Sequence, residues 1–306
     1  MLEAGLILSR FLHYCALLAL FGVSLFPLYA YRRHSEPLQF ARWRWTVLLT
    51  GAIVGLLSGA LWLMVTVANM TGALAALVDQ DALWLVLDTD FGHIWVARLV
   101  VNGVFLGMIG ARWRRTGDGH RDNYLPLLAG LLLASLASVG HTRQNEGIEE
   151  FIQIGADAAH LLAAGAWLGG LLVLAYILSP SNSRLATGQD LEHVLLRFSG
   201  MGYVAVAGLV ASGVINSWFL VGSVAGLVGT LYGQLLLVKL SLFAAMLSLA
   251  AANRLWLVPS LRREIGQQRV LLIRLRRHVL GEEILGLLVV SIVSVLGMIE
   301  PAVGRV

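Results

Sequence analysis

Four histidines interrupt apolar stretches of the sequence, and their side chains are candidate metal ligands. His13, His93, His141 and His160 lie in four separate apolar segments. Burial of a polar group without a partner costs roughly 2–7 kcal/mol, and lipid offers no hydrogen bonds. Imidazole nitrogen binds copper, zinc, iron and nickel. We therefore predict a metal site formed by His13, His141 and His160. His93, at the start of its segment, is the weaker candidate, and an interfacial role is the alternative for each histidine.

Charged residues accompany two of these histidines at helical spacing. Arg10 precedes His13 by three residues, and Asp157 precedes His160 by three. Residues three apart share one face of a helix. Two roles for Asp157 stay open. It either pairs with Arg10 between two helices, or it orients a metal-binding imidazole from the second coordination shell.

Two further cations and two methionines lie within or at the ends of apolar segments. Arg98 and Lys239 lie about two turns into their segments, where they either neutralise acidic partners or bind an anionic group. Met70 and Met298 are possible soft ligands for Cu(I). Plain packing is the commoner role of methionine in a membrane helix.

The composition excludes a water-soluble fold. Of the 306 residues, 58% are hydrophobic and 13% are charged, whereas soluble domains carry about 25% charged residues. The 22 Lys and Arg residues form short clusters between apolar runs, so nucleic-acid binding is excluded although the isoelectric point is 9.6. One cysteine, Cys15, excludes an intramolecular disulfide and a cysteine-rich metal site. The sequence predicts an all-α, multi-pass membrane protein.

Eight segments are apolar and long enough to cross a bilayer, which takes about 20 residues. They are 4–31, 46–69, 93–111, 124–141, 151–179, 198–221, 230–257 and 281–299. The first holds Arg10 and His13 and lacks a basic leader, so we do not expect a cleaved signal peptide. Residues 1–306 form a single membrane domain. Glu282 and Glu283, near the start of the last segment, are expected to be solvated.

Arginine clusters predict the orientation of the chain. Seventeen of the 22 cations fall in alternate loops, at 32–44, 112–121, 184–197 and 254–277. The intervening loops hold mostly Asp and Glu, with Arg143 as their only cation. Cytoplasmic loops of membrane proteins carry the excess of Lys and Arg. Both termini are therefore predicted to lie in the periplasm.

The two halves of the sequence resemble each other. Thr89–Leu99 and Thr230–Leu240 both read Thr-x-aromatic-Gly-x5-cation-Leu. Further matches keep the same order: His13 with His160, Gly22 with Gly169, Ser58 with Ser212, and Gly140 with Gly297. Chance matching between Leu- and Gly-rich helices is the alternative. We predict a parallel 4+4 repeat, with halves of about 1–145 and 146–306. This arrangement puts the first and fifth segments' histidines at one depth, where they could face each other.

Several short motifs occur in order along nearly the whole chain. They include Arg10-Phe-Leu-His13, Thr89-Asp-Phe-Gly92, Gly140-His141 followed by Asn145-Glu-Gly147, the block His160-Leu-Leu-Ala-Ala-Gly-Ala-Trp-Leu-Gly-Gly-Leu171, Ser212-Gly213, Thr230-x-Tyr-Gly233 and Ala252-Asn-Arg254. Together they resemble the CopD family of bacterial inner-membrane copper resistance proteins. The resemblance implies a copper homeostasis protein that works beside a periplasmic CopC-type copper-binding protein and moves copper ion across the inner membrane, most simply inward. His13, His141 and His160 match the family's histidines, and His93 does not.

Two other functions stay open from the residues. His13 and His160, if they face each other at one depth, could ligate haem b from both sides, as histidine does in many haem proteins. The protein would then carry electrons. A scaffold or sensor whose metal is only structural is the third reading. No nucleotide-binding or acidic ATPase motif occurs in the sequence, and we predict no enzymatic activity.

Overall fold

The computed structural model describes residues 2–31, 36–72, 79–113, 123–139, 147–182, 188–263 and 268–303. Within these residues the chain is helical and contains no strand, as the sequence predicts. The elements, in chain order, are α1 Leu2–Ala30, α2 Leu38–Thr71, α3 Gln80–Leu87, α4 Asp90–Trp113, α5 Tyr124–Ala134, the 3-10 helix η2 Ser135–Val139, α6 Ile148–Ile177, the 3-10 turn η4 Pro180–Asn182, α7 Gly188–Leu220, α8 Val224–Gly229, α9 Leu231–Ala252, the π-helix η5 Asn253–Leu257, α10 Val258–Arg263 and α11 Gln268–Leu296.

Seven helices in the described part of the chain are long and apolar enough to cross a membrane. They are α1, α2, α4, α6, α7, α9 continuing into α10, and α11, and they match seven of the eight predicted segments. The predicted segment 124–141 differs, because α5 and η2 form a shorter apolar helix, Tyr124–Val139. The eighth crossing therefore stays a prediction. His141 lies outside the described residues.

Three of the long helices start well before their predicted segments. α2 begins at Leu38 rather than at 46, α7 at Gly188 rather than at 198, and α11 at Gln268 rather than at 281. Their first turns are rich in arginine and other polar residues, so hydropathy misses them while the helical hydrogen bonds continue. In α2 one such residue, Arg44, is buried and pairs with Glu36 at 2.6 Å.

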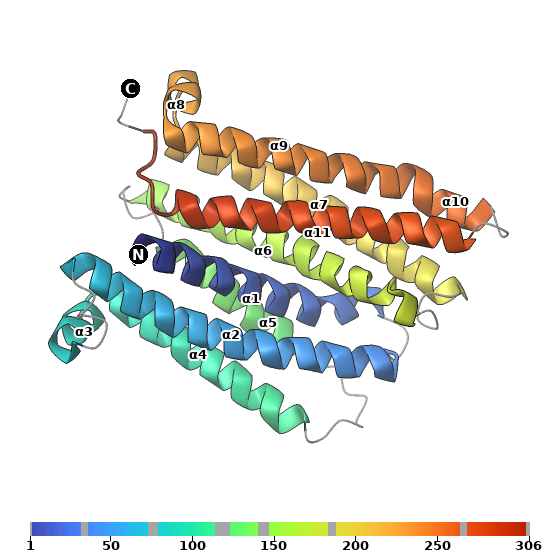
Figure 1. Cartoon of the computed structure of the whole chain (residues 1–306), viewed down its shortest axis with the longest axis horizontal. Coiled ribbons are helices and arrows are strands. Elements are labelled where there is room, and N and C mark those ends of the chain that lie inside the picture. The colour runs from blue at the N-terminus through green and yellow to red at the C-terminus, as the bar shows by residue number, and fades with distance from the viewer. Residues whose placement is uncertain are drawn as a thin grey trace.

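α1 and α6 form the central pair of the bundle (Figure 1). α2, α4 and α5 pack on the α1 side, and α7, α9 and α11 on the α6 side. The central helices approach closely because glycines meet: a Cβ on Gly22 would clash with the Gly165 carbonyl and with Gly169. Small residues allow such backbone contact between membrane helices.

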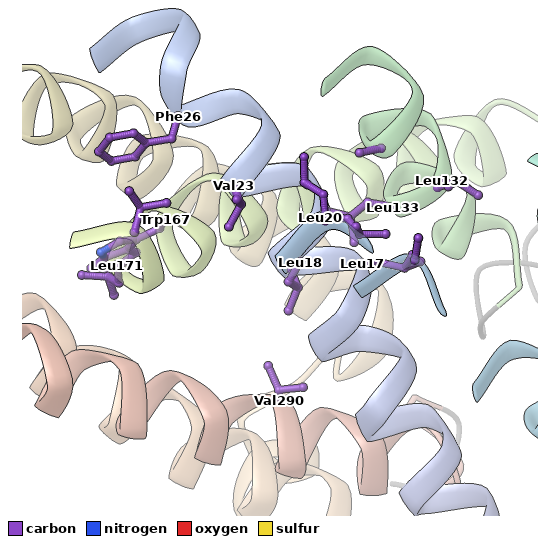
Figure 2. Packing of buried hydrophobic residues seen from close by; sticks show 14 of the residues in the cluster. Leu17, Leu18, Leu20, Val23, Phe26, Leu132, Leu133, Trp167, Leu171 and Val290 are labelled. Atoms are coloured by element: carbon purple, nitrogen blue, oxygen red, sulfur yellow. The ribbon is translucent and has the colours of Figure 1, made fainter. Parts of the chain in front are cut away.

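Leucine and aromatic side chains fill the space around the central pair. Figure 2 labels members of this cluster: Leu17, Leu18, Leu20, Val23 and Phe26 from α1, Leu132 and Leu133 from α5, Trp167 and Leu171 from α6, and Val290 from α11. α1 contributes five of these ten residues, and it contacts helices of both halves. α1 therefore joins the two groups of helices in the core.

Both chain ends lie at one end of the bundle (Figure 1). The short helices α3 and α8 lie at the same end. Each begins with a capping side chain: Asp79 accepts from the first amides of α3, and Ser223 accepts from Gly226 in α8. The periplasmic location of this end remains the prediction of the arginine bias.

Candidate functional site

His13 is buried between α1, α2 and α4, with 3% of its surface exposed. Its Nε2 lies 2.9 Å from Arg98 Nη2. A guanidinium can only donate, so Nε2 accepts and the ring proton is on Nδ1. Nδ1 lies 3.0 Å from the Gly55 carbonyl oxygen and 3.1 Å from Ser58 Oγ. The imidazole is therefore neutral, and both of its nitrogens are engaged.

Arg98 holds three elements together around this ring. Its Nη1 donates to the Leu132 carbonyl at 3.1 Å and to Ser135 Oγ, while Nη2 donates to His13. Its guanidinium also lies 5.1 Å from the Trp95 ring centroid. Among the described residues no carboxylate pairs with Arg98, so it does not neutralise an acidic partner there. A metal at His13 Nε2 would require Arg98 to withdraw.

Two tryptophans form the walls around His13. The ring centroids of Trp62 and Trp95 lie 5.7 and 5.8 Å from that of His13, and 4.8 Å from each other. Trp95 Nε1 donates to the Gly59 carbonyl at 2.8 Å, which fixes this indole. A Cβ on Gly59 would lie 3.1 Å from His13 Cε1, so the glycine leaves room for the ring.

His160 makes the corresponding serine contact in the second half. Its Nδ1 lies 2.9 Å from Ser212 Oγ, and the Ser212 hydroxyl lies 2.5 Å from the Gly208 carbonyl. Because that hydroxyl donates to Gly208, it accepts from His160, and the ring proton is again on Nδ1. His160 Nε2 is left unprotonated and has no hydrogen bond to any described residue. The lone pair of this nitrogen is therefore not used by any described residue.

The charged residues near His160 differ from the predicted arrangement. Asp157 Oδ1 accepts from Asn216 Nδ2 at 3.3 Å and forms no ion pair with Arg10 among the described residues. Arg10 instead lies over Trp62, 5.0 Å from the ring centroid. Of the two roles left open for Asp157, the ion pair with Arg10 is thus not formed in the described part of the chain, and the orienting role stays a prediction. Lys239 interacts electrostatically with both Asp157 and His160, but it does not bond to the imidazole as Arg98 does.

The other predicted ligands are more dispersed. His93 is exposed in the first turn of α4, and Met70 is 69% exposed near the end of α2. Met298 is half-buried after the end of α11. Among the described residues no three His, Cys, Asp or Glu side chains are close enough to hold one metal ion. The structure also does not join His13 and His160, since each ring bonds to helices of its own half.

Sequence reasoning missed a polar network at the other end of the bundle. Glu282 was expected to be solvated, but it is 2% exposed and accepts from Asn253 Nδ2 at 2.7 Å. Asn253 Oδ1 in turn lies 2.9 Å from His278 Nδ1. Glu282 and Asn253 line a cavity of about 270 Å³ bounded by α6, α7, α9 and α11. His278 and Glu282 are four residues apart and so share one helix face, and this spacing is the sequence feature that could have indicated the polar network.

The fold defines a multi-pass, helical membrane protein with a buried histidine, His13, in its first half and a partly buried one, His160, in its second. Comparison with protein families then gives its relationship. Residues 1–151 match the N-terminal domain family of copper resistance protein D-like proteins, and residues 192–296 match the copper resistance protein D family. The chain belongs to the CopD family.

Individual relatives cover most of the chain. Copper resistance protein D of Pseudomonas syringae pv. tomato is 33% identical over 305 residues, covering 95% of each chain. The inner membrane protein YebZ of Escherichia coli K12 is 31% identical, over 98% of this chain and 100% of YebZ. The copper transport protein CutJ of Bacillus subtilis 168 is 33% identical over 88% of this chain, which spans about half of CutJ (49%). No solved structure matches. The protein is a multi-pass inner-membrane protein.

The haem alternative gains no support from these findings. The matched families and two of the three relatives are named for copper, and none is named for haem. In addition, the histidines proposed as a pair of axial ligands bond within separate halves of the bundle.

Proposed function

We propose that this protein moves copper across the inner membrane and that His160 is its first ligand in the outer half. One observation carries the proposal. His160 Nδ1 is held by Ser212, while Nε2 is unprotonated and has no hydrogen bond to a described residue. A hydrogen bond at one ring nitrogen fixes the tautomer that lets the other bind a metal. The names of relatives, copper resistance and copper transport, support copper as the cargo.

His13 is the second ligand in this proposal, and Arg98 controls access to it. Arg98 Nη2 lies 2.9 Å from the nitrogen that a metal would use. Copper therefore reaches His13 only when the guanidinium moves away, so the structure corresponds to a closed state of this half. His141 is proposed to add a further imidazole, with Asp157 as an orienting carboxylate. His93 is exposed and is the least suited of the four.

The proposed direction is inward, with a periplasmic CopC-type protein as the copper donor. The direction and the donor both rest on the family resemblance. The arginine bias, which predicts that the outer histidines lie toward the periplasm, also supports them. Movement of one half against the other, across the glycine contact of α1 and α6, would open the site inward.

Copper flux into proteoliposomes tests this function. The purified protein is reconstituted with a copper-responsive fluorophore inside the vesicles, and Cu(I) with a reductant, or Cu(II), is added outside. Wild-type protein should give protein-dependent uptake that falls at least tenfold in His160→Ala. His193→Ala, an exposed histidine at the opposite end of α7, is the matched control and should transport normally. Equal uptake by wild type and His160→Ala would contradict the proposal.

A further inference from the structure

A second cavity lies at the end of the bundle that holds both termini. Its volume is about 250 Å³, and α1, α2, α4, η2 and the residues after α11 enclose it. Its polar lining is Arg10, Thr66 and Asn69, while Trp62 and Phe91 contribute to its apolar walls. The described lining contains a positive charge and no carboxylate.

Three hydrogen-bond donor atoms in this lining are buried without a partner. They are Nε and Nη1 of Arg10 and the hydroxyl oxygen of Thr66. Other helical threonines bond back to their own helix: Thr50 Oγ1 donates to Thr46 at 2.9 Å, and Thr71 Oγ1 to Val67 at 3.2 Å. Leaving a buried donor unsatisfied costs about 1–3 kcal/mol, and more for a charged group. The cavity therefore holds donors prepared for an acceptor that the described residues do not supply.

The guanidinium of Arg10 is positioned without the use of these donors. Its Cζ lies 5.0 Å from the Trp62 ring centroid, as in a cation–π contact. On another side it lies against the backbone of Gly297, where an added Cβ would be 2.6 Å from Nη1. Among the described residues no carboxylate lies within ion-pair distance of Arg10. The guanidinium is thus held in position by Trp62 and Gly297, but no described residue provides a counterion for its charge.

We propose that this cavity binds a small organic carboxylate. The carboxylate oxygens accept from the Arg10 guanidinium and the Thr66 hydroxyl, which supplies the missing counterion and satisfies the unpaired donors. The apolar walls, which include Leu6 and Phe91, and the volume of the cavity suit a carboxylate with a short carbon body, and the same positively charged donors would also hold a large polarisable anion such as iodide.

The site is adjacent to His13 through Trp62. The Trp62 ring contacts the Arg10 guanidinium and also lies 5.7 Å from the His13 ring. The bound anion offsets one of the two guanidinium charges around His13, those of Arg10 and Arg98. The consequence of this change for copper binding at His13 rests on the proposed copper function. Carboxylate binding itself does not depend on copper, so it is tested without the metal.

Iodide quenching of Trp62 fluorescence, with acetate as competitor, tests the carboxylate site. Trp62 lines the cavity and is only 4% exposed, so it responds to an anion bound inside and little to ions in bulk solution. The full-length protein in detergent contains nine tryptophans, and a Trp62→Phe variant identifies the contribution of this one. We expect saturable quenching by iodide that Trp62→Phe lacks and that acetate reverses. Caesium, a cationic quencher, should give no saturable component.

Substitutions in the lining decide the assignment. Arg10→Gln should abolish the saturable component, Arg10→Lys should retain part of it, and the nearly isosteric Thr66→Val should weaken iodide and acetate binding several-fold. Thr66→Val keeps the test valid if Arg10→Gln does not fold. Saturable quenching that survives in Arg10→Gln, or quenching that acetate leaves unchanged, would overturn the proposal.

Discussion

At the residue scale, the two halves share one hydrogen bond and differ in another. Both histidines engage a serine of the next long helix through Nδ1, at 3.1 Å for His13 and 2.9 Å for His160. Arg98 occupies Nε2 of His13, whereas Lys239 leaves Nε2 of His160 without a bond. The sequence aligned these residues, but it could not show that they touch. Hydropathy and spacing do not specify how a helix is rotated about its own axis.

Removal of the Ser212 hydroxyl tests the orientation of His160. Ser212→Ala should weaken copper binding about 10–100-fold, because loss of a ligand's orienting hydrogen bond has effects of that size. Competition with a copper chelator on purified protein measures the affinity. Ser248→Ala is the matched control, since Ser248 is exposed and bonds only to its own helix. An affinity unchanged in Ser212→Ala would show that this hydrogen bond does not prepare the ligand.

Removal of the Arg98 charge tests whether this residue blocks copper from His13 in the first half. Two unit charges 4 Å apart repel by about 4 kcal/mol at an effective dielectric constant of 20. Arg98→Gln should therefore tighten copper binding at His13 at least tenfold, a gain that is lost again in the double variant with His13→Ala. Arg98→Lys, which keeps the charge, is the control. Unchanged affinity in a folded Arg98→Gln protein would show that Arg98 does not control the site.

At the element scale, the apolar runs predicted the long helices but not their ends or the short helices between them. The π-helix at Asn253 and the caps at Asp79 and Ser223 depend on local hydrogen bonds, which hydropathy does not record. Gly22 and Gly169 entered the sequence analysis only as matching positions of the two halves, and their close contact across the central pair required the structure. Burial of Glu282 was missed for a related reason, because its partner Asn253 comes from a different helix.

The contact between α1 and α6 predicts the effect of glycine substitutions. Gly22→Ala should lower the free energy of unfolding by about 1–3 kcal/mol, since overpacking of a tight contact has this cost. Gly103→Ala in α4 is the matched control. A Cβ there meets nothing within 4 Å, so stability should be unchanged or slightly higher. Denaturation of the detergent-solubilised proteins measures both, and equal stability of the two variants would contradict the close packing.

At the scale of the whole molecule, the composition alone predicted the membrane class, and the family comparison agrees with the resemblance carried by the motifs. The parallel repeat remains a prediction, supported by the matching histidine–serine bonds. Two halves that are related by a sequence repeat can still pack their corresponding helices differently. Here α4 packs on α2, whereas its counterpart α9 packs mainly on α11.

The predicted orientation is open to a labelling test. In a Cys15→Ala background, Asp81→Cys in α3 and Gln268→Cys at the start of α11 place one thiol at each end of the bundle. A membrane-impermeant maleimide should label position 81, and not position 268, in spheroplasts, because both termini are predicted to be periplasmic. Detergent permeabilisation should expose both. The opposite labelling pattern would reverse the proposed topology.

The central claim is that copper binds His160 in the outer half. X-ray absorption at the copper edge of the loaded, purified protein tests this claim most directly, because it detects imidazole ligands around the metal. The account predicts imidazole scattering that decreases in His160→Ala and is unchanged in His193→Ala. A copper environment without imidazole, or one identical in wild type and His160→Ala, would contradict the account.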